Sequence, residues 1–105
     1  MVEFQYFDGC PNATETLNNL NLLVEEGFLT RGEINVLEIK DLEDAKTMNF
    51  QGSPTILFDG IDIYSERKPI SYAYSCRLYV INDVQTGILP KDYIKRQVTK
   101  LKQKG

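Results

Sequence analysis

The stretch VEFQYFDGCPNA, residues 2–13, places a cysteine where a predicted strand gives way to a predicted helix. Apolar side chains alternate along residues 2–7, which is typical of a strand, and the pair Asp8-Gly9 interrupts that alternation. Pro11 follows the cysteine directly, and proline is well suited to the first position of a helix. We therefore expect Cys10 to lie between the end of a strand and the start of a helix.

The segment that follows has the apolar spacing of an amphipathic helix that ends near Gly27. One helical face collects residues three or four positions apart, namely Ala13, Leu17, Leu20, Leu23 and Val24. Three asparagines in this segment are poor interior helix formers, so packing must stabilise the helix. A second, shorter helix over residues 41–49, capped by an aspartate, is expected to bury Leu42, Ala45 and Met48.

The rest of the chain continues to alternate between predicted strands and helices. Strands are expected at 33–39, 55–58 and 61–64, and a last helix at 90–103. A crossover helix makes the first two strands parallel, and the tight turn Asp59-Gly60 makes the last two antiparallel. The order β-α-β-α-β-β-α predicts an α/β fold, a four-stranded mixed sheet with helices on both faces. Residues 65–89 have no clear period, and 75–82 fit a short helix or an extended segment equally well.

Composition excludes several kinds of chemistry. The chain has 105 residues, 15 acidic and 12 basic side chains, two cysteines and no histidine. This length predicts a single domain, residues 1–105. Without histidine there is no Ser-His-Asp or Cys-His catalysis and no histidine metal site. Two cysteines cannot fill a four-thiolate zinc site or build a disulfide framework, so chemistry must come from a thiol, carboxylates, tyrosines, lysines or hydroxyls.

The charge and hydropathy patterns bear on location and partners. No apolar run approaches the roughly 20 residues that span a bilayer, and the N-terminus does not resemble a signal peptide. We therefore expect no membrane partner and a cytoplasmic location, where thiols stay reduced unless they are redox-active. Six of the 12 basic residues lie in 91–105 beside one of the 15 acidic residues, so this segment carries +5 and the rest −8. The acidic remainder repels phosphates, so we expect no nucleic-acid partner and a solvated basic helix face.

Cys10 is the first candidate for a reactive group. The first N–H groups of a helix lack intrahelical partners and carry partial positive charge, which favours a thiolate over a thiol. The nearby carboxylate of Asp8 acts in the opposite direction. The alternative is a small, inert, buried side chain, since cysteine is among the most buried residue types. The position after Asp-Gly, at a loop–helix junction, favours an exposed and reactive Cys10.

The second feature is the sequence Ser53-Pro54-Thr55, directly before the strand at 55–58. A cis X-Pro bond is uncommon, and base rates favour an ordinary trans proline at the start of a strand. Only the predicted topology favours a cis bond here.

Together, these features resemble the thioredoxin-like superfamily. The shared features are the element order, a cysteine-proline pair at the head of the first helix, and Gly52-Ser53-Pro54-Thr55 before the third strand. The sequences Asp8-Gly9-Cys10-Pro11 and SCRLY at 75–79 are also similar to a small, poorly characterised group of single-domain thioredoxin-like proteins, whose relatives are sometimes labelled alkylmercury-lyase-like. The resemblance implies that Cys10 is the nucleophile and that Pro54 is the cis-proline beside it. A groove formed with Pro11, Ser53 and Thr55 is then expected to hold a substrate chain by backbone hydrogen bonds.

The chain departs from the family at the second cysteine of its redox motif. The family has Cys-x-x-Cys, whereas Ala13 occupies the last position here, so a dithiol mechanism within the motif is excluded. The predicted strand at 61–64 returns to the Cys10 edge, and the next 12 residues span about 20 Å even when half-extended. Cys76 is therefore within reach of Cys10. The alternative is a core role for Cys76, beside Leu78 and Val80.

Three functions stay open, and whether the chain is an enzyme stays open with them. The first is a thiol-disulfide oxidoreductase or thiol-reactive protein without a cofactor, acting on a protein or small-molecule thiol or disulfide. In it, Cys10 attacks and Cys76 or an external thiol resolves the mixed disulfide. The second is binding of a soft metal or metalloid, of the mercury or copper type, by the two thiolates, with Asp8 as a third ligand.

The third function is a non-catalytic interaction module with a thioredoxin-like fold. Its contact surface would consist of exposed tyrosines, namely Tyr64, Tyr72, Tyr74 and Tyr79. Arg77 is expected to form a surface ion pair with one of the many acidic residues. The sequence does not fix the oligomeric state.

Overall fold

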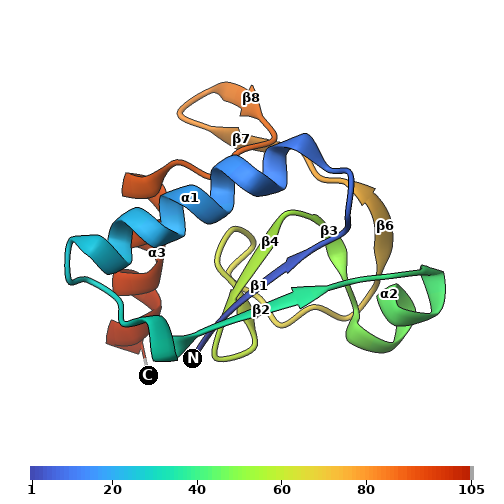
Figure 1. The fold of residues 1–105 in the computed structure, drawn as a ribbon, viewed down its shortest axis with the longest axis horizontal. Coiled ribbons are helices and arrows are strands. Elements are labelled where there is room, and N and C mark those ends of the chain that lie inside the picture. Colours follow the sequence, from blue (N-terminus) through green and yellow to red (C-terminus); the bar gives the residue numbers. More distant parts are fainter. Residues whose placement is uncertain (105) are drawn as a thin grey trace.

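The central sheet has four strands in the order β2-β1-β4-β5 (Figure 1). The computed structural model describes residues 1–104. The strands are β1 (Val2–Tyr6), β2 (Ile34–Glu38), β4 (Thr55–Phe58) and β5 (Ile61–Asp62). β1 pairs in parallel with β2 and antiparallel with β4, and β4 and β5 form a tight hairpin. These pairings confirm the predicted mixed α/β sheet.

The main core lies between the sheet and two helices, α1 (Pro11–Glu25) and α3 (Lys91–Lys104). Figure 1 shows these helices side by side on one face of the sheet. The predicted apolar face of α1 is largely confirmed, since it packs into the core with its deepest residues Ala13, Leu20 and Leu23. Each buried leucine of this kind contributes about 1.5–3 kcal/mol, which outweighs the poor helix propensity of the asparagines.

A second, smaller cluster of buried residues surrounds the short helix α2 (Leu42–Met48). Ala45 packs there with Ile39 and Phe50. The predicted cap is confirmed, since the carboxylate of Asp41 accepts a hydrogen bond from the backbone N–H of Asp44 at 2.8 Å. The predicted burial of two other residues is wrong, because the side chains at both ends of the helix are exposed, namely Leu42 and Met48. A helix of only two turns buries one narrow stripe, and Ala45 alone occupies it.

The segment with no clear period forms extended structure and no helix. Strand β6 (Ala73–Cys76) pairs in parallel with β3 (Gln51–Ser53), a strand that the sequence pattern did not reveal. Strands β7 (Tyr79–Ile81) and β8 (Val84–Thr86) form a hairpin. Its two turn residues, Asn82 and Asp83, both have positive φ, as the favoured two-residue hairpin turn requires. Figure 1 shows this hairpin beside the N-terminal part of α1.

The basic C-terminal helix α3 buries its apolar stripe and exposes its charged one. Ile94, Val98 and Leu101 are buried, as predicted. On the outer side, Lys100 and Lys104 lie 3.0 and 3.5 Å from the carboxylate of Glu66. Among residues 1–104, no helix is both long enough and apolar enough to cross a membrane.

Candidate functional site

Cys10 and Cys76 are neighbours in space although 66 positions separate them in the chain. Their Sγ atoms are 3.8 Å apart, and both thiols are free. The pairing of β3 with β6 sets Cys76 opposite Ser53, whose carbonyl oxygen lies 3.6 Å from the Sγ of Cys10. Since a disulfide bond is about 2.05 Å long, this is a dithiol with its two sulfur atoms in contact.

The surroundings of Cys10 differ from those expected of a helix-start thiolate. Cys10 is the N-cap residue of α1 and Pro11 follows it in the first turn, as predicted. However, the Cys10 side chain makes no capping hydrogen bond to the helix, and its Sγ is directed at Ser53 and Cys76 instead. The expectation of an exposed Cys10 is wrong, because only 5% of the residue is accessible. Cys76, by contrast, is exposed.

The Ser53–Pro54 peptide bond is cis. This is the outcome that the topology favoured over the base rate. Four residues were predicted to bind substrate. Three of them are buried, namely Ser53, Pro54 and Thr55, whereas Pro11 is exposed. The hydroxyl of Ser53 accepts a hydrogen bond from the backbone N–H of Phe7 at 3.3 Å. The cis-proline turn is thereby joined to the end of β1, directly beside Cys10.

The groove beside Pro54 is filled by the chain's own β6 segment. The backbone N–H of Arg77 donates to the carbonyl of Ser53 at 2.9 Å, and that of Ala73 donates to Phe50 at 2.7 Å. Gly52 permits this close approach, because an added Cβ would lie 3.0 Å from the carbonyl oxygen of Ser75. The backbone groups that were expected to hold a substrate chain are therefore already engaged within the molecule.

Arg77 fixes the end of β6 to the body of the protein. Its guanidinium donates two hydrogen bonds to the carboxylate of Asp62, at 2.6 and 3.2 Å, and one to the hydroxyl of Thr55 at 3.1 Å. The ring centroids of Tyr64 and Tyr79 lie 5.4 and 4.7 Å from the guanidinium carbon Cζ of Arg77. The prediction of a surface ion pair is wrong, because the side chains of Arg77 and Asp62 are only 12% and 1% accessible.

Sequence reasoning missed Asp62, although one signal was present. Asp62 lies between two isoleucines in a short strand, so its side chain projects to the opposite face from theirs. A carboxylate placed there in a buried hairpin needs a cationic partner. Arg77, which follows Cys76 directly, is that partner.

Tyr79 extends the same anchor to the cis-proline turn. Its hydroxyl donates a hydrogen bond to the carbonyl of Pro54, and the residue is fully buried. Burial raises the pKa of Tyr79, which therefore remains a neutral hydrogen-bond donor. Four tyrosines were expected to be exposed on a contact surface. That expectation is wrong for the buried Tyr79, and Tyr64 is only partly accessible, whereas Tyr72 and Tyr74 are exposed.

The two thiols interact electrostatically as well as sterically. The hydrogen bond with Cys10 raises the pKa of Cys76, and burial and the charge of Cys10 act in the same direction. In the dithiol, Cys76 donates its proton toward the sulfur of Cys10.

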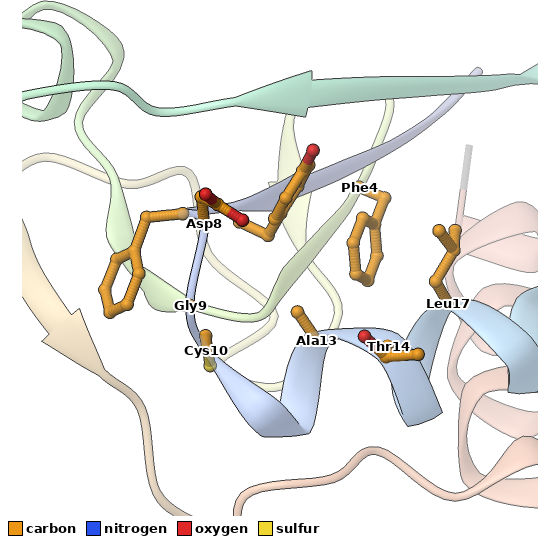
Figure 2. Close-up of a pocket in the computed structure, with 9 residues that line it drawn as sticks. Phe4, Asp8, Gly9, Cys10, Ala13, Thr14 and Leu17 are labelled. Carbon is orange, nitrogen blue, oxygen red and sulfur yellow. The ribbon is translucent and has the colours of Figure 1, made fainter.

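A cavity of about 210 Å³ lies beside Cys10, between β1 and the first turns of α1 (Figure 2). Its lining is largely apolar and aromatic and includes Phe4, Tyr6 and Leu17. The exposed carboxylate of Asp8 also lines it. We refer to this cavity as the β1–α1 recess.

No group of three or more histidine, cysteine or acidic side chains in the described residues 1–104 could hold a metal ion together. Asp8 therefore does not join Cys10 and Cys76 as a third ligand, and that expectation is wrong.

Comparisons of this chain with protein-family models, with curated proteins and with solved structures give no match. The functional conclusion therefore depends on the geometry of the two cysteines and of the cis-proline turn beside them.

Proposed function

We propose that this protein is a thioredoxin-like thiol-disulfide oxidoreductase whose redox pair is Cys10 and Cys76. The observation that carries the proposal is the 3.8 Å separation of the two sulfur atoms. Since a disulfide is about 2.05 Å long, the sulfur atoms need to approach by only about 1.8 Å to bond. In this proposal Cys76 is the resolving cysteine, because Ala13, at the usual position of that cysteine, has no thiol.

The strand order supports a thioredoxin-like fold. In that layout, as the resemblance of the sequence implies, a parallel β-α-β unit is followed by an antiparallel hairpin and a last helix. The sheet order β2-β1-β4-β5, with α1 and α3 packed together, agrees with it. The cis bond before Pro54, next to the N-cap cysteine of α1, agrees with it as well.

The proposed reaction is a two-electron exchange. The dithiol gives two electrons and two protons to an external disulfide RSSR, which becomes two RSH molecules, while Cys10 and Cys76 become a disulfide. The reverse reaction regenerates the dithiol at the expense of two RSH. No metal or organic cofactor is needed, because the electrons move between sulfur atoms.

Equilibration of the wild-type protein in glutathione redox buffers of graded potential tests the proposal. We expect loss of two hydrogen masses from the monomer as the buffer becomes oxidising, with Cys10 and Cys76 joined in the peptide map. Persistence of the dithiol at every ratio, or formation of intermolecular dimers in its place, would contradict the proposal.

Turnover is tested separately with a chromogenic small disulfide and dithiothreitol as the reductant. The wild-type protein should accelerate the exchange, and Cys10→Ser and Cys76→Ser should each remove that acceleration. If the internal disulfide forms but the protein does not accelerate the exchange, the oxidoreductase proposal is contradicted. The result would then favour the non-catalytic interaction module that the sequence left open.

Binding of a soft ion is the second candidate function, because the same two sulfur atoms offer two-coordinate ligation. Thiolates suit Cu(I) and, by analogy, mercury, and neither needs a third ligand from the protein. Titration of the reduced protein with Hg(II) should then give one ion per chain and protect both thiols from alkylation. An affinity that is unchanged in Cys76→Ser would exclude this site.

A further inference from the structure

We propose that external thiols and small disulfides exchange with this protein at Cys76, and that Cys10 acts only as its internal partner. The inference rests on the proposed redox pair and reverses the roles that the sequence suggested. It assigns the entry point of the substrate and favours a low-molecular-weight substrate over a polypeptide held in the cis-proline groove.

Exposure distinguishes the two sulfur-bearing residues. Cys76 lies on β6, whose four residues are all exposed, whereas Cys10 is 5% accessible and is covered by Ser53 and by Cys76 itself. Because thiol exchange requires contact between sulfur atoms, the more exposed sulfur meets an external reagent first.

The direction of attack favours Cys76 as well. In thiol-disulfide exchange, the attacking sulfur approaches the central sulfur from the side opposite the leaving sulfur. For attack on Cys76, the attacking sulfur reaches an exposed residue on an exposed strand. For attack on Cys10, the attacking sulfur must reach a residue of which only 5% is accessible.

Two features beside Cys10 disfavour an external reagent. The β1–α1 recess carries the carboxylate of Asp8, which repels an incoming thiolate and the carboxylates of a molecule such as glutathione (Figure 2). The cis-proline groove is filled by β6, because the carbonyl of Ser53 already accepts the N–H of Arg77. An extended polypeptide cannot use that groove while β6 remains in place.

Reduction then proceeds in two balanced exchanges. A thiolate RS⁻ attacks the sulfur of Cys76, a bond from R–S to Cys76 forms, and the bond between the two cysteines breaks with Cys10 leaving as a thiolate. A second RS⁻ attacks the R-bearing sulfur, which releases RSSR and the Cys76 thiolate. The two protons given up by the external thiols return to Cys10 and Cys76.

Single-cysteine variants test the point of entry with oxidised glutathione as the probe. Folded Cys10→Ser should gain one glutathione at Cys76. Folded Cys76→Ser should react more slowly at Cys10, by a factor on the order of tenfold, because thiol modification follows exposure. In urea, the two variants should react at similar rates, which controls for thiol integrity. Circular dichroism of both variants checks that each is folded.

The wild-type protein supplies a second measurement. The oxidised form is mixed with reduced glutathione, quenched with acid and mapped, and glutathione is expected on the Cys76 peptide with Cys10 as a free thiol. Equal or faster labelling of Cys10 in folded Cys76→Ser, or glutathione on Cys10 in the wild type, would overturn the inference. Failure of the proposed function appears elsewhere, as absence of the internal disulfide in oxidised wild-type protein.

Discussion

Strand β4, which follows the cis-proline turn, and the edge strand β6, which carries Cys76, are held in very different ways. Three of the four residues of β4 are buried within the central sheet, whereas all four residues of β6 are exposed. β6 is held by backbone hydrogen bonds to β3 and by the side chains that follow Cys76, above all Arg77 and Tyr79. Cys10 thus belongs to the core, whereas the position of Cys76 depends on an anchored edge.

The largest effect is expected from removal of the charged anchor. Arg77→Met leaves the carboxylate of Asp62 buried without its partner, and breaking a buried pair in this way typically costs about 3–5 kcal/mol. Urea unfolding should show the loss of stability, and formation of the Cys10–Cys76 disulfide should slow in parallel. A change below about 1 kcal/mol, the range of a surface ion pair, would show that the ion pair does not hold β6.

A smaller loss is expected from crowding β6 at its closest approach. Gly52 has φ +106°, and an added Cβ would lie 3.0 Å from Ser75 and Arg77, so Gly52→Ala should cost about 1–3 kcal/mol and slow disulfide closure. Gly32→Ala is the matched control, because Gly32 has nothing within 4 Å of an added Cβ and no positive φ. Equal rates of disulfide closure in the two variants would show that β6 tolerates the added methyl group.

A still smaller effect is expected at the tyrosine anchor. Tyr79→Phe keeps the ring but removes the hydroxyl that donates to Pro54, so the free energy of unfolding should fall by about 1 kcal/mol. Tyr72→Phe, at an exposed residue next to β6, should stay within about 0.5 kcal/mol of the wild type. The comparison would fail if both substitutions had the same effect in denaturant titrations.

The smallest expected effect is a shift in pH dependence. Because the hydrogen bond with Cys10 is the main cause that raises the pKa of Cys76, Cys10→Ala should move the pH midpoint of Cys76 alkylation downward. By linkage, a pKa that is raised in the folded state means that the free energy of unfolding of the reduced protein falls as pH rises above the ordinary cysteine pKa of about 8.5. Iodoacetamide rates measured against pH, with urea-unfolded protein as the reference, check both statements. An unchanged or higher midpoint in Cys10→Ala would contradict them.

The sequence predicted those parts of the fold in which side-chain period and burial coincide. The alternation in β1, the apolar face of α1 and the turn Asp59-Gly60 specify their own elements, since each is a local pattern. β6 has no such pattern, because its four residues are all exposed and its position is set by pairing with distant β3. The pairing depends on contacts with Gly52 and Asp62, which no local rule connects to Cys76.

The candidate site was predicted in the same uneven way. The position of Cys10 at the helix start follows from a short local motif, whereas the cis bond before Pro54 was favoured only by the predicted topology. The burial of Cys10 does not, because its cover comes partly from Cys76, 66 positions away. Exposure is therefore a tertiary property here, and the local sequence does not specify it for Cys10.

The separation of the two cysteines along the chain has a topological consequence. A bond from Cys10 to Cys76 would close a covalent ring that contains β2, β4 and β5, and would leave β1 outside it on one side and the β7–β8 hairpin and α3 on the other. Chain-entropy arguments give a ring of this size about 4 kcal/mol of stabilisation. Such a molecule would be a ring with two open ends, and oxidation would restrict the unfolded chain between the two cysteines while leaving β1 and α3 unrestricted.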